Sequence, residues 1–239
     1  MERNVTQPLI KEPATIPLPE SLSETLSVLE QLEKSFSKTE GYAERSALHF
    51  RIEQVRRHAL RMQLSDLFTD RNRIVLEIGC GHGHFLTAYA DLHRELPCVG
   101  IDLINKRIVR AEVKRTRRGL SHLRFLKAEA SEFFDELPPS VQVQRYFVLF
   151  ADPWPKKRHW KNRLLQPAHL ELLANRALPG AELYFRTDHG EFYDWVKTNI
   201  SESPHWRLAP ELPWPFEEKT VFQGFADSFQ SLCAVKSGS

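Results

Sequence analysis

The stretch Ile74–Gly83, with the sequence IVLEIGCGHG, decides the fold of this chain. Its first five residues form a mostly apolar run that is typical of a buried strand, and a helix is predicted after it at Phe85–Arg94. The glycines Gly79, Gly81 and Gly83 permit a tight turn from strand to helix and let a ligand approach the backbone. The stretch therefore predicts the first strand, the first turn and the ligand pocket of a strand–helix repeat.

Strands and helices alternate through the rest of the chain. Four more apolar runs predict strands, at Cys98–Asp102, Leu123–Lys127, Tyr146–Phe150 and Ala181–Arg186. Helical segments follow most of them, at Lys106–Arg118, Gln166–Ala177 and Gly190–Ile200. This alternation predicts an α/β fold with a mostly parallel sheet and helices on both faces. Near the end, Thr220–Ala226 and Leu232–Lys236 are expected to add a hairpin at the edge of the sheet.

The first 70 residues differ in character, so we expect an N-terminal extension, 1–70, followed by one domain, 71–239. Four prolines among the first 20 residues predict an extended lead-in. Ser21 and Glu24 match a capping box, and leucines at helical spacing follow as far as Phe36. A second helix is expected at His49–Leu64, with its arginines turned outward.

The composition indicates a globular protein without a membrane segment. Of the 239 residues, 41% are hydrophobic and 27% are charged, and no apolar run approaches the roughly 18 residues that span a bilayer. The N-terminus carries acids and has no signal-like apolar stretch, so we expect a cytoplasmic protein. Cys80, Cys98 and Cys233 show no CxxC pairing, which predicts reduced cysteines and no metal site.

Acidic residues within or just after three of the predicted strands indicate which cofactor the pocket takes. Asp102 ends the second strand, where a carboxylate accepts hydrogen bonds from ribose hydroxyls in both nicotinamide and adenosyl cofactors. The glycine spacing is G-x-G-x-G rather than the dinucleotide pattern G-x-G-x-x-G, and Glu77 would repel a pyrophosphate but attract an ammonium. S-adenosyl-L-methionine is therefore favoured over a nicotinamide cofactor, with Glu129 placed to reach the adenine amino group.

A basic segment follows the fourth predicted strand. The run ends in Asp152-Pro153-Trp154-Pro155, and five cations follow it: Lys156, Lys157, Arg158, Lys161 and Arg163. Basic residues also cluster at Arg51–Arg61 and Lys106–Arg118. Clustered positive charge is typical of proteins that bind a polyanion, although a solvated helix face explains any single run equally well.

Four motifs in the expected order carry a family resemblance over about Ile74–Gly224. They are FADPWPKKRH at 150–159, LLQP at 164–167, FRTD at 185–188 and TVFQ at 220–223. Behind the glycine turn, these motifs resemble those of the bacterial tRNA (guanine-N7-)-methyltransferases of the TrmB type. The resemblance implies a Rossmann-like class I S-adenosylmethionine-dependent methyltransferase that methylates N7 of guanosine 46 in the variable loop of tRNA.

The resemblance also implies roles for individual residues. Asp152 is implied to be catalytic, and the cofactor contacts are Glu77, Asp102, Glu129 and Asp152, with the three glycines completing the pocket. Substrate contacts are implied at Lys156, Asp188, Thr220 and Gln223, and RNA contacts at Arg158, His159, Lys161 and Arg163. Three positions depart from the family pattern: Asp102 and Gln223 each stand where Glu is usual, and Asn162 where Arg is usual.

Several alternatives stay open on the sequence. The enzyme could methylate guanine N7 in another RNA, and a non-catalytic RNA-binding protein or an oxidoreductase could share the fold. Trp154, between two prolines, could be a packing wedge, and Asp188 could cap the helix that follows it. The expected partner is tRNA, and the expected state is a monomer or a weak homodimer.

Overall fold

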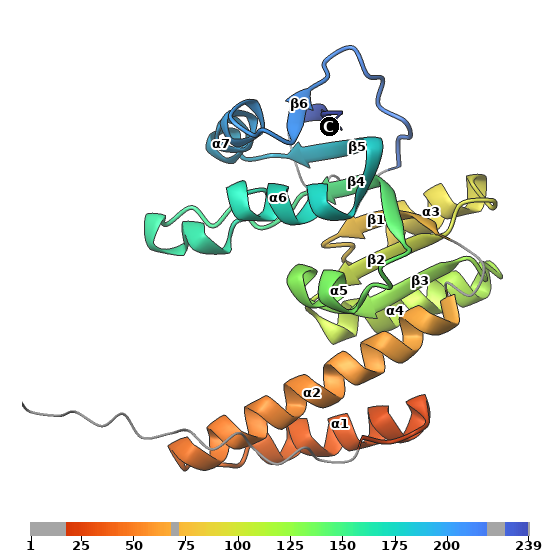
Figure 1. Cartoon of the computed structure of the whole chain (residues 1–239), viewed down its shortest axis with the longest axis vertical. Coiled ribbons are helices and arrows are strands. Elements are labelled where there is room, and N and C mark those ends of the chain that lie inside the picture. Colours follow the sequence, from red (N-terminus) through yellow and green to blue (C-terminus); the bar gives the residue numbers. More distant parts are fainter. Residues whose placement is uncertain (1–17, 68–71, 219–227, 239) are drawn as a thin grey trace, which may run out of the picture. The chain divides into compact units, whose positions relative to one another are not determined.

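The computed structural model describes residues 18–67, 72–218 and 228–238 (Figure 1). Contacts divide the chain into two compact units, Met1–Gln63 and Leu64–Ser239, which are described separately. Across the described ranges, no helix is both long enough and apolar enough to cross a membrane.

The first unit contains a pair of helices, α1 (Leu22–Phe36) and most of α2 (Tyr42–Leu67). The Ser21 side chain caps α1 by accepting a hydrogen bond from the Glu24 backbone N–H, as the capping pattern predicts. The helices are joined by a hydrogen bond from the Thr25 hydroxyl to the Met62 sulfur, 3.8 Å long. Helix α2 begins seven residues before the predicted start at His49.

The second unit is built on a seven-stranded sheet with the order β3-β2-β1-β4-β5-β7-β6. The strands are β1 (Arg73–Ile78), β2 (Cys98–Asp102), β3 (Leu123–Lys127), β4 (Gln142–Leu149), β5 (Ala177–Thr187), β6 (Trp206–Leu208) and β7 (Gln230–Lys236). Strands β1 to β5 are parallel, whereas β7 runs antiparallel between β5 and β6. The direction of strand addition reverses at β1, which lies between β2 and β4.

The helices of this unit, labelled in Figure 1, form two contact groups. They are α3 (His84–Leu92), α4 (Asn105–Arg117), α5 (Ala130–Glu136), α6 (Pro167–Arg176) and α7 (Gly190–Ser201), with a 3-10 helix η1 (Lys157–Asn162). Helices α3 and α4 contact each other, while α6 contacts both α5 and α7. Parallel strands are joined by right-handed crossovers, so reversing the strand order puts these groups on opposite faces. The predicted α/β architecture is confirmed.

The central strands are apolar along their length because helices cover both of their faces. Ile74, Val75 and Leu76 of β1 are each 0% exposed. On one face, the Phe147 ring lies 4.7 Å from the Phe85 ring and 5.3 Å from the Tyr184 ring, measured between centroids. This packing holds α3 against β4 and β5, and β1 pairs with β4 in the sheet, so the carboxyl ends of these strands lie beside one another.

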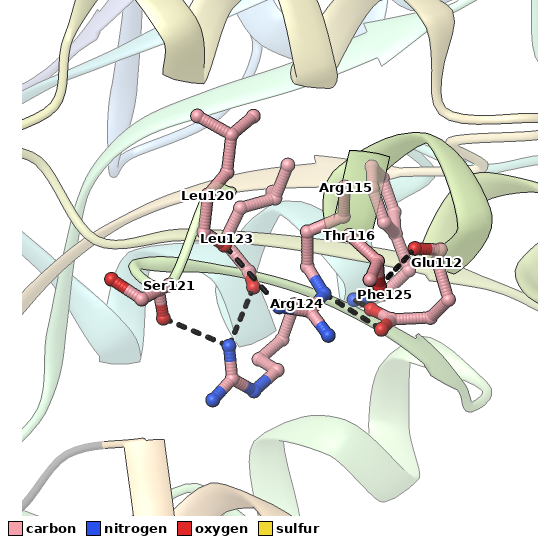
Figure 2. A network of polar contacts seen from close by, with 8 residues as sticks. All are labelled: Glu112, Arg115, Thr116, Leu120, Ser121, Leu123, Arg124 and Phe125. Carbon is pink, nitrogen blue, oxygen red and sulfur yellow. Dashed lines mark hydrogen bonds and ion pairs between the residues drawn. The ribbon is translucent and has the colours of Figure 1, made fainter. Parts of the chain in front are cut away.

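A network of side chains closes the outer edge of β3 (Figure 2). The Glu112 carboxylate of α4 accepts a hydrogen bond from the Phe125 backbone N–H at 2.8 Å, and it also pairs with Arg115 Nε at 2.7 Å. The Arg124 guanidinium donates to the carbonyl oxygens of Ser121 and Leu123. The Phe125 N–H and the Leu123 carbonyl, which belong to this border strand, are thereby hydrogen-bonded to side chains.

Element boundaries differ from the prediction in the second half of the chain. Strand β4 begins at Gln142, four residues early, because a polar start hides it from a search for apolar runs. Strand β5 begins at Ala177, four residues before the predicted start at Ala181, and its pairing with β4 shifts register near that end. The expected strand Leu232–Lys236 lies within β7, while Thr220–Ala226 falls outside the described residues.

Candidate functional site

Acidic residues gather where the carboxyl ends of neighbouring strands meet. Glu77 is the last residue but one of β1, Asp102 ends β2, Glu129 follows β3, and Asp152 follows β4. The strand order reverses between β2 and β4, and open α/β sheets bind ligands outside the carboxyl ends of strands at such a switch point. The predicted cofactor residues are therefore brought to one edge of the sheet.

Glu77 is a buried carboxylate with an unused oxygen. Its residue is 3% exposed; one carboxylate oxygen accepts a hydrogen bond from the Leu86 backbone N–H, while Oε2 has no partner among the described residues. Burial raises the pKa of Glu77 to about 8, and the nearby Asp102 charge adds to this effect. An orphaned buried acceptor of this kind suits a cationic donor supplied by a ligand.

The three glycines of the turn have different environments. All have left-handed backbone angles, with φ of +79° at Gly79, +53° at Gly81 and +69° at Gly83. A Cβ atom at Gly79 or Gly81 would meet nothing within 4 Å, whereas one at Gly83 would lie 2.6 Å from the Phe125 ring. The first two glycines therefore leave open space beside the backbone, and Gly83 permits close packing against β3.

Asp102 organises the end of β2. Its Oδ2 accepts a hydrogen bond from the Gly81 N–H at 3.0 Å, and its Oδ1 accepts one from the Ile104 N–H at 2.8 Å. Arg107 approaches Oδ2 at 3.5 Å. The carboxylate thus ties the glycine turn to the start of α4, and only its remaining lone pairs are available to a ligand.

Two apolar residues beside Asp102 were missed in the sequence analysis. Leu103 is 65% exposed and Ile104 is 44% exposed, although both directly follow a buried strand. Exposed apolar side chains next to a pocket offer a surface to a flat ring. The signal in the sequence was an apolar pair immediately after the acid that ends a strand.

Glu129 is exposed at the first turn of α5. It is the N-cap residue of that helix; its carboxylate accepts a hydrogen bond from the Ser131 hydroxyl, and its backbone N–H approaches Glu132 Oε2 at 3.5 Å. Its position after β3 leaves the carboxylate at the same sheet edge as Asp102.

Asp152 lies in a loop whose backbone is strained on both sides. Phe150 has φ of +52° and Trp154 has φ of +43°, angles that non-glycine residues rarely adopt. Asp152 itself is exposed. Strained backbone of this kind persists where the surrounding structure fixes it, and it clusters at functional sites.

The basic loop after Asp152 presents most of its charge to solvent. Lys156, Arg158 and Lys161 are exposed, and Arg158 Nε donates to the His159 ring at 3.0 Å. The Trp154 ring stacks on His159 with 5.7 Å between centroids and remains 37% exposed. Trp154 therefore forms part of the loop surface while packing on His159, and its role as a packing wedge stays a prediction.

The environment of Arg163 differs from the RNA contact that the sequence analysis implied for it. Its side chain is fully buried; Nε donates to the Pro153 carbonyl at 2.7 Å, and Nη2 pairs with Glu191 at 3.2 Å. The guanidinium also lies 4.4 Å from the Trp160 ring centroid. A phosphate has no access to this group, so Arg163 holds the Asp152 loop in place and the implied RNA contact is wrong at this position.

Asp188 does not cap the helix that follows it. The N-cap of α7 is His189, whose ring accepts a hydrogen bond from the Phe192 N–H, and Asp188 stays exposed at the end of β5. Next to it, buried Arg186 forms two 2.8 Å bonds to the Glu217 carboxylate. Thr220 and Gln223 lie outside the described residues.

The arrangement combines acidic groups for a cationic ligand with a basic rim for a polyanion. Buried Glu77 and Asp102 face the glycine turn, and exposed Asp152 precedes the cations of η1. Within the described ranges, no three His, Cys, Asp or Glu side chains gather closely enough to hold a metal ion.

Comparison with known proteins identifies the relatives of this chain. The sequence model of the family described as "Putative methyltransferase" matches residues 71–222. A tRNA (guanine-N(7)-)-methyltransferase of Chromohalobacter salexigens is 32% identical over 170 residues, which cover 68% of this chain and 69% of the relative. Its namesake in Halorhodospira halophila is 33% identical over 135 residues, covering 56% and 58%.

A third relative and a solved structure complete the comparison. The Corynebacterium diphtheriae protein of the same name is 28% identical over 62% of this chain and 56% of its own length, so two of these three matches span little more than half of the relative. The 16S rRNA methyltransferase KamB is 20% identical with a TM-score of 0.51, covering 74% of this chain and 93% of KamB. This likeness shows the fold alone and, with the strand order, confirms the expected Rossmann-like methyltransferase fold.

Proposed function

Because the chain belongs to the tRNA (guanine-N(7)-)-methyltransferase family, we propose that it methylates N7 of guanosine 46 in the variable loop of tRNA, with S-adenosylmethionine as the methyl donor. One observation carries this proposal. The buried Glu77 carboxyl has an oxygen with no partner among the residues that the structure describes, next to two open glycines at the switch point of the sheet.

The residues at this edge fit the parts of the cofactor. Glu77 Oε2 would accept a hydrogen bond from the ammonium, and the free lone pairs of Asp102 would accept from the ribose hydroxyls. Leu103 and Ile104 would offer their exposed side chains to the adenine ring, and Glu129 would accept from the adenine amino group. A dinucleotide fits less well, since Glu77 and Asp102 would repel its pyrophosphate. When bound, S-adenosylmethionine supplies a methyl group already activated by the sulfonium.

The protein's task in this reaction is mainly to position the base. Guanine N7 has an in-plane lone pair and no proton, so no general base is required, and alignment of the reacting atoms dominates. The purine becomes cationic as N7 is alkylated, and the exposed Asp152 carboxylate stabilises that charge. The same carboxylate can accept from guanine N1–H and the 2-amino group, a pair of donors that adenine lacks.

The basic loop compensates for the cost of exposing the base. Moving a nucleotide out of its stack costs on the order of a few kcal/mol. Lys156, Arg158 and Lys161 are exposed beside Asp152, and contacts from such cations to phosphates supply affinity that falls as salt rises. Trp154 and His159 add a stacked aromatic surface next to these cations.

The test is methyl transfer from labelled S-adenosylmethionine to unmodified tRNA transcripts that differ only at position 46. We expect label on the transcript with guanosine there and none on the one with adenosine, with the label mapping to N7. Equal labelling of both transcripts would reject position 46. An absence of labelling by a protein that binds the cofactor tightly would reject the activity on tRNA.

A further inference from the structure

Helix α4 carries an unusual concentration of positive charge that the proposed site does not use. Between Asn105 and Arg118, seven residues are basic and Glu112 is the single acid. The helix packs through Ile108 and Ala111, which are 6% and 0% exposed, and its other residues are exposed or half-buried. The charge therefore lies on the outside of the second unit.

Three of the seven cations have carboxylate partners. Arg107 approaches Asp102 at 3.5 Å, Arg115 pairs with Glu112 at 2.7 Å, and Arg118 pairs with Asp91 at 3.2 Å. The other four make no ion pair with any carboxylate of the described residues: Lys106, Arg110, Lys114 and Arg117. We call these four residues the α4 stripe.

The α4 stripe is continuous along one face of the helix. Its members follow one another at intervals of four, four and three residues, which place them on the same side of an α-helix. At about 1.5 Å per residue, the stripe is roughly 16 Å long. Val109 and Val113, which are 54% and 44% exposed, lie beside it.

Two cations of the stripe, Arg110 and Lys114, lie close together next to the glycine turn. Arg110 Nη1 lies 3.3 Å from the His82 ring, and Lys114 Nζ donates to the His82 carbonyl at 2.8 Å. Burial lowers the pKa of Lys114, and the charges of Arg110 and Arg117 lower it further. Burial likewise lowers the pKa of His82, with Arg110 and Lys114 adding to the effect. The Asp102 charge acts in the opposite direction on His82, but burial and the surrounding cations outweigh it.

We propose that the α4 stripe is a second contact surface for the phosphate backbone of the substrate RNA; this rests on the proposed function. The stripe starts four residues after Asp102, at the sheet edge where the target base would enter. The η1 cations follow β4 on one side of β1, and α4 follows β2 on the other side, so the two basic surfaces flank the site. An RNA whose base reaches the site can therefore be held on both sides.

RNA suits this surface better than a membrane does. Helices that bind in the plane of a membrane insert a broad apolar face with large residues such as Trp, Phe and Leu, whereas α4 buries its apolar face against its own sheet. The exposed apolar residues among its cations are two valines. Phosphate contacts, by contrast, require only a row of accessible cations.

The experiment compares two triple variants of the full-length protein. The test variant is Lys106→Gln/Arg110→Gln/Arg117→Gln. The control, Arg73→Gln/Lys197→Gln/Arg207→Gln, removes the same charge from exposed positions at the start of β1, on α7 and on β6. Affinity for unmodified tRNA is measured by filter binding at several salt concentrations, and urea unfolding checks that both variants are folded.

We expect the test variant to bind tRNA about tenfold more weakly near 0.1 M salt. The slope of log affinity against log salt should fall by about 2 to 3, because each cation that no longer neutralises a phosphate lowers it by about one unit. The control should keep a slope within one unit of the wild type. Equal slopes for both triple variants would overturn the proposal, as would unchanged tRNA binding together with lost binding to phosphatidylserine vesicles.

Two further measurements separate this inference from the proposed function. The double variant Lys106→Gln/Arg117→Gln leaves the His82 contacts intact, and it should lower the slope by about 2 if the stripe contacts phosphates. An unchanged slope in this variant would also overturn the proposal. Methyl transfer by the wild type is assayed in parallel. A wild type that binds tRNA with a slope dependent on the stripe but transfers no methyl group would reject the activity and leave the contact surface standing.

Discussion

Replacement of Asp152 gives the most direct test of the proposed chemistry. Replacing it with alanine removes the carboxylate that would stabilise the cationic purine, and methyl transfer should fall by roughly 100-fold or more, as for loss of one charge-stabilising group in other enzymes. Affinity for tRNA should change little, because the phosphate contacts come from the neighbouring cations. The measurement is single-turnover methyl transfer beside filter binding.

Asp194→Ala serves as the control for that variant, since Asp194 is an exposed carboxylate on α7 with no place in the site. A parallel loss of tRNA binding and methyl transfer in Asp152→Ala would mean that the residue only maintains the loop.

Arg163 and Lys161 stand two positions apart and should behave in opposite ways. Arg163→Lys keeps the charge but cannot reach both Pro153 and Glu191, so the free energy of unfolding should fall by about 2 kcal/mol. Lys161→Ala changes an exposed residue and should stay within about 0.5 kcal/mol of the wild type while lowering tRNA affinity. Urea unfolding and filter binding measure the two effects, and the reverse pattern would restore Arg163 as an RNA contact.

Glu77 makes stability depend on pH in the absence of cofactor. Its pKa is raised to about 8 in the folded chain, so the folded state holds this proton more tightly than the unfolded state does. The resulting stability is fully present below about pH 4.5 and is lost as the pH rises through about 8. Since one pKa unit corresponds to about 1.4 kcal/mol, Glu77→Gln should retain roughly 3 to 5 kcal/mol that the wild type loses between pH 5 and pH 9.

Urea unfolding of both proteins at these two pH values gives the comparison. Parallel pH profiles for the wild type and Glu77→Gln would show that burial does not keep a proton on this carboxyl, and the raised pKa of Glu77 would then be rejected.

At the scale of elements, glycine variants of the turn between β1 and α3 can distinguish a loss of stability caused by backbone strain from a loss of ligand binding. Gly81→Ala and Gly119→Ala each place a Cβ at a left-handed residue, with φ of +53° and +62°, and neither Cβ meets an atom within 4 Å. Both should cost about 1 kcal/mol of stability. Only Gly81→Ala should weaken S-adenosylmethionine binding, by at least tenfold in calorimetry, because Gly119 ends α4 away from the pocket.

Gly83→Ala provides the opposite control, since its Cβ would lie 2.7 Å from Ala111 as well as close to Phe125. This variant should lose more stability than Gly81→Ala does. Equal cofactor affinity in Gly81→Ala and Gly119→Ala would place the cofactor away from the turn.

At the scale of the whole molecule, the cofactor should stabilise the second unit through the site alone. At 100 times its dissociation constant, a ligand that binds the folded state adds about 2.7 kcal/mol to the free energy of unfolding. Hydrogen exchange should slow in β1, α3 and β2, while peptides of α1, which contributes no residue to the site, serve as the internal reference. Slowing of similar size in α1 would contradict the assignment of the site.

Strand bounds could be predicted from the sequence where a buried strand is also an unbroken run of apolar residues. The bounds of β2 and β3 were correct because helices cover both faces of the central sheet, which makes β2 an unbroken apolar run. The start of β4 was missed because Gln142, Gln144 and Arg145 interrupt its apolar pattern, although Arg145 pairs with Glu182 of β5.

The site residues could likewise be placed only where the sequence pattern reveals their position in the fold. Strand ends placed Glu77 and Asp102 correctly, because topology alone brings consecutive carboxyl ends to one edge. Arg163 was assigned with its exposed neighbours, since a row of cations does not reveal that one of them turns inward. His189 was overlooked as a cap because histidine is not among the preferred N-cap residues.

The closed border of the sheet has a consequence for the protein in concentrated solution. On β3, Glu112 and Arg124 occupy backbone groups that would otherwise be free, and at the opposite border β6 is only three residues long. Unpaired, extended strand borders are the templates on which identical chains add to one another and form aggregates. Among the described strands, an incoming chain meets partly occupied backbone groups at β3 and a short strand at β6, which limits edge-to-edge aggregation of the folded state when the protein is expressed at high level.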